Sequence, residues 1–350
     1  MASPESRSDS VHMRNLLPVT LIVVQTTALQ WTPLATGVTA RLRGVSAVSD
    51  RVAWASGANG TILRTTDGGA TWQRLTIPGS EKLDFRDIDA IDEKTAYVLS
   101  IGPGEASRIY KTIDGGAAWT EQFVNRDAKA FFDAMAFWDA KRGIAVSDSV
   151  DGQFVVLTTS DGGQSWTRAI ASRFPPALPN EGFFAASGTN VAVVRPNHVW
   201  IGTGAAAEAR VLRSSDGGRT WSVAKTPLTS GPSAGIFSIA FTDAAHGIVV
   251  GGDYKAESAA VDNAAVTADG GKTWTAINGL SGFRSVVTYL SRDGRSVLAV
   301  GPTGSDHSTD GGKTWKPVPG PGFHTFSVAP GWKAGFAAGE KGAVAKLIVR

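Results

Sequence analysis

A short phrase, Asp-Gly-Gly followed two residues later by Trp, occurs six times in this chain. Its copies begin at Asp67, Asp114, Asp161, Asp216, Asp269 and Asp310. Successive copies lie 41 to 55 residues apart, and a repeat of that length is typical of propellers and solenoids. Six of the eleven Trp residues belong to the copies. The high Trp content is therefore a property of the repeated fold and is no evidence for a binding or catalytic site.

Each copy lies between two short runs of apolar and β-branched residues, such as residues 62–65 and 72–76. This pattern predicts a hairpin turn in which the Asp accepts backbone hydrogen bonds and the glycines take positive φ. The Trp then opens the next strand and buries apolar area. We therefore expect the six repeated aspartates to be structural. A calcium site would need a denser cluster of carboxylates.

The repeats predict four-stranded blades in which the phrase connects the third strand to the fourth. After the sixth copy, residues 323–328, 333–338 and 344–349 supply only three strands, while residues 30–34 resemble the beginning of a fourth strand. The sequence therefore predicts an all-β, seven-bladed β-propeller of four-stranded antiparallel blades, closed by an N-terminal outer strand. Six blades with a tail are the alternative. Residues 174–188 form an insert before the inner strand of blade four.

The N-terminal segment has the features of an export signal. Residues 1–28 are expected to be a polar leader plus signal peptide, with Met1 or Met13 as the start and cleavage after Ala28. A tail with a chance apolar patch is the alternative. Residues 29–350 would form a single propeller domain. The chain has no Cys, so it has no lipid-anchor cysteine, no disulfide and no thiol chemistry. From these features we expect the protein to be periplasmic or secreted.

Composition excludes two classes of partner. No run of 18 apolar residues follows the N-terminal segment, so no membrane span is expected in the mature chain. The net charge is +3, with no basic run or basic helix to indicate nucleic acid. The five His residues lack metal-ligand spacing. We expect no metal and no cofactor.

The candidate site lies where the inner strands begin, on the face opposite the repeated turns. Aligning these strands places charged residues in one column near the axis. The column contains Arg43, Arg86, Asp133, Phe237, Arg284 and His324. Three arginines with a histidine would attract an anion, because guanidinium groups bind carboxylates and phosphates bidentately. Alternatively, they pair with Asp87, Asp133 and neighbouring groups in a solvated tunnel.

Loops near this column add further candidates. Asp148, Asp253 and Tyr254 are candidate ligand-binding residues, together with Asp87 and the basic members of the column. Glu181, Asp133 and Glu105 are candidate catalytic acids for glycoside cleavage, which needs a general acid and a second carboxylate. Their separations do not follow from the sequence, so the chain is left as either an enzyme or a binding module.

Residues 65–72 fit the Asp-box (BNR repeat) pattern, Ser/Thr-x-Asp-x-Gly-x-Thr/Ser-Trp, at every position, whereas the second copy has Ala118 instead of Thr or Ser. The chain resembles Asp-box propellers, and residues 60–72 most resemble the photosystem II stability/assembly factor-like group. The resemblance implies a periplasmic or lumenal seven-bladed propeller that binds partner proteins through a basic patch. Arg43, Arg86 and Arg284 would belong to that patch.

Sialidases share the same box, and their arginine triad and Tyr–Glu pair could be matched by Arg43, Arg86 and Arg284 with Tyr254 and Glu181 or Glu257. Their Arg-Ile-Pro motif is absent, because Gly44 and Val45 follow Arg43. Two hypotheses result. The first is a monomeric binding or assembly module for a protein partner or an anionic or glycan ligand. The second is a glycoside hydrolase, sialidase-like or another exo-glycosidase.

Overall fold

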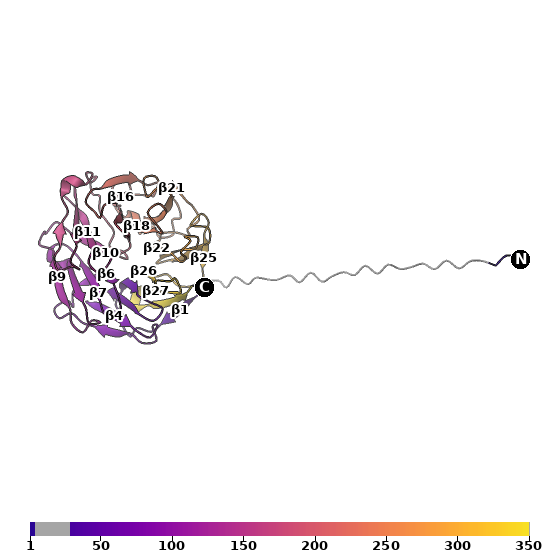
Figure 1. Cartoon of the computed structure of the whole chain (residues 1–350), viewed down its shortest axis with the longest axis horizontal. Helices are drawn as coiled ribbons and strands as arrows, with labels where there is room; N and C mark the ends of the chain where they lie inside the picture. The colour runs from indigo at the N-terminus through magenta and orange to yellow at the C-terminus, as the bar shows by residue number, and fades with distance from the viewer. Residues whose placement is uncertain (4–28, 350) are drawn as a thin grey trace.

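The computed structural model describes residues 1–3 and 29–349. Apart from its first three residues, the expected leader and signal peptide, with the cleavage site after Ala28, lies outside the described residues. The described chain forms seven four-stranded antiparallel sheets arranged as a ring, so the predicted seven-bladed β-propeller is confirmed. Figure 1 shows β6, β10, β18, β22 and β26 near the centre of the ring, with β9, β21, β25 and β1 toward its rim.

In blades one to six, the chain runs from the inner strand to the outer strand. The strands of blades one to three are β2 (Leu42–Ala47), β3 (Ala53–Gly57), β4 (Thr61–Thr65), β5 (Gln73–Leu75), β6 (Asp84–Ala90), β7 (Ala96–Ile101), β8 (Arg108–Thr112), β9 (Thr120–Val124), β10 (Phe132–Phe137), β11 (Gly143–Val150), β12 (Gln153–Thr159) and β13 (Thr167–Arg168). Those of blades four to six are β14 (Val191–Val194), β15 (His198–Gly202), β16 (Arg210–Ser214), β17 (Ser222–Lys225), β18 (Ala234–Phe241), β19 (Gly247–Asp253), β20 (Ala264–Thr267), β21 (Thr275–Ala276), β22 (Val286–Tyr289), β23 (Val297–Gly301), β24 (Gly304–Ser308) and β25 (Lys316–Val318).

Blade seven is built from both ends of the described chain. Its first three strands are β26 (Thr325–Val328), β27 (Ala334–Ala338) and β28 (Val344–Ile348), and its outer strand is β1 (Trp31–Leu34). β1 pairs antiparallel with β28, from Trp31 opposite Leu347 to Leu34 opposite Val344. The predicted closure by the N-terminal strand is confirmed. It leaves no unpaired third strand at the junction, where a free sheet edge would invite aggregation.

The repeated phrase folds as a compact hydrogen-bonded turn. In the first copy, the Thr65 hydroxyl donates to the Asp67 carboxylate at 2.8 Å and accepts the Gly69 N–H at 2.9 Å. The N–H and hydroxyl of Thr71 donate to the same carboxylate at 2.9 and 2.6 Å. Gly68 and Gly69 have φ of 79° and 93°, which a side chain would strain.

The other copies repeat this arrangement. In the second copy, Asp114 accepts the Ala118 N–H but has no hydroxyl donor from that position. Hydrogen bonds lower the pKa of Asp161 and Asp310 to about 2, because they favour the charged form. All six carboxylates are thus bound within their own turns. Within residues 1–3 and 29–349, no group of three or more His, Asp or Glu side chains could hold a metal ion.

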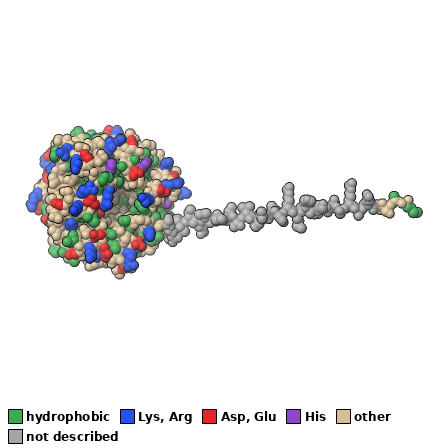
Figure 2. All heavy atoms as spheres, in the orientation of Figure 1, with side chains coloured by type: hydrophobic (Ala, Val, Ile, Leu, Met, Phe, Trp, Pro, Cys, Tyr) green, Lys and Arg blue, Asp and Glu red, His purple; other side chains and the backbone are tan. Residues whose placement is uncertain are grey.

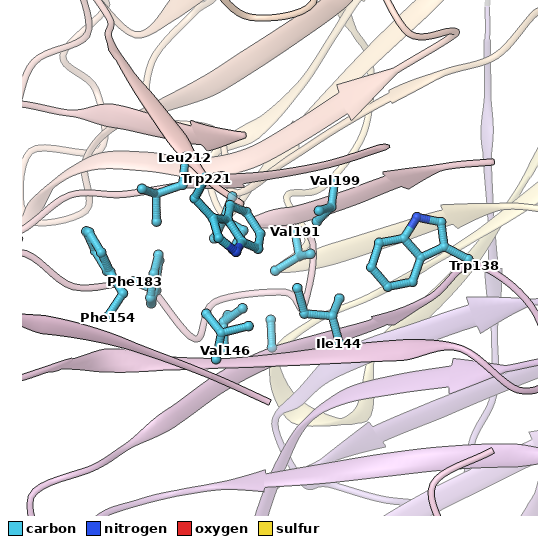
Figure 3. Packing of buried hydrophobic residues seen from close by; sticks show 12 residues of the cluster. Trp138, Ile144, Val146, Phe154, Phe183, Val191, Val199, Leu212 and Trp221 are labelled. Atoms are coloured by element: carbon cyan, nitrogen blue, oxygen red, sulfur yellow. The ribbon is translucent and has the colours of Figure 1, made fainter. Parts of the chain in front are cut away.

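The core lies between neighbouring blades. Strands such as β3 and β27 are buried at every position, because a middle strand is covered on both faces by adjoining sheets. Figure 3 shows the cluster between blades three and four. It includes Trp138, Ile144, Val146, Phe154, Phe183, Val191, Val199, Leu212 and Trp221. The helices in the described part of the chain are three-residue 3₁₀ turns, and none could cross a membrane.

Side chains also join the inner strands of neighbouring blades. Ser46 accepts the Ala90 N–H at 3.0 Å, and Ser238 accepts the Val287 N–H at 2.9 Å. These bonds satisfy strand N–H groups that face the axis, where an unpaired donor would be costly. They connect the inner strands of blades one and two, and those of blades five and six, directly across the axis side of the sheets.

Candidate binding face around the propeller axis

A β-bulge occurs at the same position of four inner strands. The strand register skips Arg43, Arg86, Asp133 and Phe237. A bulge bends the strand and turns the unpaired residue in a new direction. These residues form four of the six positions in the column found from the sequence. The other two, Arg284 and His324, lie just before β22 and β26.

A segment of the blade-four insert lies across the axis. We call residues 183–190 the plug segment. The Ala186 carbonyl accepts a hydrogen bond from Arg43 at 3.3 Å, and the Ala185 carbonyl accepts one from Arg86 at 3.0 Å. The segment therefore reaches blades one and two, although it precedes blade four in the chain.

The plug segment also reaches the opposite side of the ring. Ser187 donates to the Ser285 carbonyl at 2.9 Å and its own carbonyl accepts from Thr325 at 3.4 Å. Thr189 donates to Ser238 at 2.8 Å. The segment thus contacts blades five, six and seven, and it occupies the axis at this level. Sequence reasoning located the insert but missed this role.

A basic cluster lies beside the plug segment. It consists of Arg41, Arg43, Arg86 and His324. The carboxylates of Asp84 and Glu340 neutralise part of it: Asp84 lies 2.9 Å from the Arg86 Nε and 3.9 Å from Arg41, and Glu340 lies 2.7 Å from the His324 ring. Sequence reasoning missed Arg41, whose only signal was its position two residues before Arg43.

Arg43 is the member of this cluster without an anion. Its guanidinium donates to the Ala186 carbonyl, and it forms no ion pair with any carboxylate of the described residues. Burial and the charges of Arg86 and Arg41 lower its pKa to about 10. Burial and the Arg43 charge also lower the pKa of His324. The cluster contains three guanidinium groups and two carboxylates. Its net charge is therefore positive even when His324 is neutral. Figure 2 shows Lys and Arg side chains beside Asp and Glu on the face turned to the viewer.

Arg284 is placed apart from the other two arginines of the column. It is 1% exposed and forms an ion pair with Asp306, with the Nε at 2.7 Å and the terminal nitrogen at 2.6 Å from one oxygen. It also donates to the Phe283 carbonyl. Its charge is therefore satisfied inside blade six. The structure brings Arg43 and Arg86 together but does not bring Arg284 to them.

An aromatic group adjoins the other side of the plug segment. Phe184 stacks on Phe237 with centroids 4.0 Å apart, and Tyr254 meets both rings edge-on. Tyr254 is 43% exposed, whereas Phe237 and Phe283 are buried. Asp253, next to Tyr254, accepts the Lys255 N–H in its loop. Phe184 was not among the expected site residues.

Three of the acidic candidates, Asp87, Asp133 and Asp148, lie next to the plug segment. Asp87 is buried and accepts the Met135 N–H at 2.6 Å. Asp148 accepts the Phe183 N–H at 2.8 Å, and burial raises its pKa to about 6. Burial, aided by the charge of Asp148, also raises the pKa of Asp133. These carboxyl groups are thus tied to the inner strands and the plug.

The other two candidate acids have different surroundings. The Glu181 side chain is fully buried, paired with Arg210 and hydrogen-bonded by Thr203 at 2.7 Å. Glu105 is exposed on a 3₁₀ turn near Arg108 and Arg126. The charge of Asp148 acts on Asp133. Among the described residues, no hydrogen bond or ion pair joins either of these side chains to the side chain of Glu181 or Glu105. The glycoside hydrolase hypothesis stays a prediction from sequence.

Comparisons with known proteins agree with this architecture. The family described as photosynthesis system II assembly factor YCF48 matches residues 23–121, and the BNR/Asp-box repeat matches residues 306–317. No curated protein matches the chain. The solved structure "YCF48 bound to D1 peptide" is 17% identical with a TM-score of 0.66, covering 91% of this chain and 97% of that one. "YCF48 from Cyanidioschyzon merolae" gives the same identity, TM-score and coverage of this chain, and 98% of that chain is covered. The predicted resemblance to the BNR/Asp-box propellers of the photosystem II assembly factor-like group is thereby confirmed.

Proposed function

We propose that this chain is an exported binding or assembly-type module whose basic cluster holds an anionic segment of a protein partner. The observation that carries this proposal is the guanidinium of Arg43, which lies near Arg41 and Arg86 and forms no ion pair with a carboxylate of residues 29–349. A carboxylate from a partner would relieve the repulsion among these groups. It would also accept charge-assisted hydrogen bonds, which are stronger than neutral ones.

The comparisons support a protein partner. One matching family carries the description of an assembly factor, and one similar structure is titled as bound to a D1 peptide. An extended peptide suits this proposal, because the plug segment contacts blades on both sides of the axis, so a ligand would lie over this face and would not enter the axis. Tyr254, which is 43% exposed, and the half-buried Phe184 offer an apolar contact on the other side of the plug segment. Export to the periplasm or the medium rests on the sequence of residues 1–28.

A peptide-binding experiment tests the proposal. Fluorescein-labelled octaglutamate and octalysine are titrated with the purified protein at low salt, and binding is followed by anisotropy. We expect octaglutamate alone to bind, with an affinity that falls as salt rises. Arg43→Gln should weaken binding at least tenfold, or about 1.4 kcal/mol.

Arg74→Gln is the matched control, because Arg74 is an exposed arginine on the outer strand of the same blade. It should leave the affinity for octaglutamate unchanged. The proposal would be refuted if the two peptides bound equally well, or if Arg43→Gln and Arg74→Gln lost the same affinity. Either outcome would mean that the peptides bind nonspecifically and not at the basic cluster.

A further inference from the structure

Four blades share a pair of facing residues, an aromatic side chain on the second strand and a cation on the third. The pairs are Trp54 with Arg64, Tyr97 with Lys111, Trp200 with Arg213, and Phe336 with Lys346. Because the repeat places each pair at the same point of its blade, three of them serve as internal references for the fourth.

In the three reference blades, the cation contacts the facing aromatic ring. It lies 5.3, 5.1 and 5.3 Å from the ring centroid in the pairs of Arg64, Lys111 and Lys346. It also reaches the next blade. Arg64 pairs with Glu93 at 3.2 Å, Lys111 donates to the Gly162 carbonyl at 2.8 Å, and Lys346 donates to the Asp50 carbonyl at 2.6 Å.

Blade four departs from this pattern. The Trp200 ring is stacked with Phe241 at 3.6 Å and with His198 at 5.7 Å. Its N–H donates to the Gly270 carbonyl at 2.8 Å, which corresponds to the Gly162 carbonyl that Lys111 binds. Within the described residues, the Arg213 guanidinium takes part in no hydrogen bond, ion pair or cation–π contact.

Arg213 does not occupy the position that the cation takes in the reference blades. A Cβ built on the first glycine of the next turn would meet Arg64 at 3.0 Å, Lys111 at 3.3 Å and Lys346 at 3.0 Å, but at Gly270 no atom of Arg213 lies within 4 Å. A cavity of about 380 Å³ occupies this junction of blades four and five, near β16 and β21 in Figure 1. Its lining includes Arg213, Lys272, His198, Ser215, Ser222 and Trp221.

We propose that this junction cavity is a second binding site, for a small molecule that carries a carboxylate or phosphate group. Arg213 would hold the oxyanion bidentately, and Lys272 and the hydroxyls of Ser215 and Ser222 would supply further donors. Asp269 also lines the cavity, but its carboxylate is bound by Thr267 and Thr273 within its own turn. The volume lies at the lower end of the range of small-molecule sites.

The site is independent of the basic cluster. It lies with the Asp-box turns, and successive antiparallel strands place those turns at the opposite end of the blades from the beginnings of the inner strands. A ligand in the junction cavity and a peptide on the axial face would therefore bind without competing.

Calorimetric titration tests this site. The full protein is titrated with sodium phosphate, sodium glucuronate and glucose, the last as a neutral molecule of similar size to glucuronate. We expect saturable binding of phosphate, glucuronate or both, and none of glucose. Comparing the two anions distinguishes a phosphate ligand from a carboxylate ligand.

Two matched variants locate the binding. Arg213→Gln should weaken it at least tenfold without lowering the thermal unfolding midpoint, because within the described residues the Arg213 guanidinium makes no hydrogen bond, ion pair or cation–π contact that the change would remove. Arg64→Gln, at the same position of blade one, should bind like the wild type but unfold at a lower temperature. Absence of saturable anion binding, unchanged binding in Arg213→Gln, or equal loss in both variants would overturn the proposal.

Discussion

Replacing Trp31 by Ala tests whether the N-terminal strand locks the ring. Trp31 is 7% exposed, and its ring lies 5.0 Å from Phe323 and 5.6 Å from Phe326. Trp31 is the first residue of β1, the only strand that covers the outer edge of β28 among the described residues. Removal of the indole therefore weakens both the core of blade seven and the closure.

The magnitude follows from the buried indole. Truncating a buried Trp to Ala costs about 3 to 5 kcal/mol, and each aromatic contact contributes about 0.5 to 1.5 kcal/mol of such a loss. Trp31→Phe should cost much less. The Trp31 N–H is buried without a hydrogen-bond partner, so its removal offsets part of the lost area.

Equilibrium unfolding in urea provides the measurement, with tryptophan fluorescence and far-ultraviolet circular dichroism as two probes that must agree. Thr32→Ala is the control, because Thr32 is exposed on the same strand. We expect Trp31→Ala to lower the free energy of unfolding by at least about 3 kcal/mol, with Thr32→Ala unchanged. A loss of less than about 1 kcal/mol in Trp31→Ala, within the range of surface changes, would refute the reasoning.

Two further predictions concern buried charges. The pKa of Asp148 is raised from 3.8 to about 6 in the fold, so the folded state binds more protons than the unfolded state between these values. The stabilisation is complete below about pH 4 and is lost as pH rises through about 6, by at most about 3 kcal/mol. Urea unfolding from pH 4 to pH 8 should show this fall, and Asp148→Asn should reduce it; an unaltered pH profile in the variant would contradict the assignment. Arg210→Ala should cost about 3 to 5 kcal/mol, because it leaves the Glu181 carboxylate buried and unpaired. The double change with Glu181→Gln should recover part of this loss, and no recovery would argue against the pairing.

The architecture could be predicted because its determinants are local and repeated. Each Asp-box places a turn through contacts within seven residues, as from Thr65 to Thr71, so a turn can be recognised without knowing the rest of the fold. Six such turns set the period of the blades. The three strands after the last turn and the single strand containing Trp31 then gave the seventh blade by counting.

The geometry of the candidate site followed from the sequence only in part, and the roles of its residues stay predictions. The position of the column was correct, because the repeat places Arg43, Arg86, Asp133 and Phe237 at the same point of their strands. The bulge that turns these side chains appears only in the pairing of β2, β6, β10 and β18 with their neighbours. The sequence placed Arg284 at the same alignment position but gave no indication of its partner.

By itself, then, the sequence determined the repeat and the all-β class, since these depend on neighbouring residues and on periodicity. It favoured seven blades closed by the N-terminal strand over six blades with a tail, and the pairing of β1 with β28 decided between them. The tertiary structure alone decided which charges are free. Arg284 and Arg43 occupy the same column, yet Arg284 is paired with Asp306, whereas the one hydrogen bond of the Arg43 guanidinium within the described part of the chain is to a carbonyl of the plug segment. Ion pairs and cavities form between segments that are far apart in the chain, and the energy of an ion pair depends on distance and burial. A local sequence pattern contains no information on either the distance or the burial.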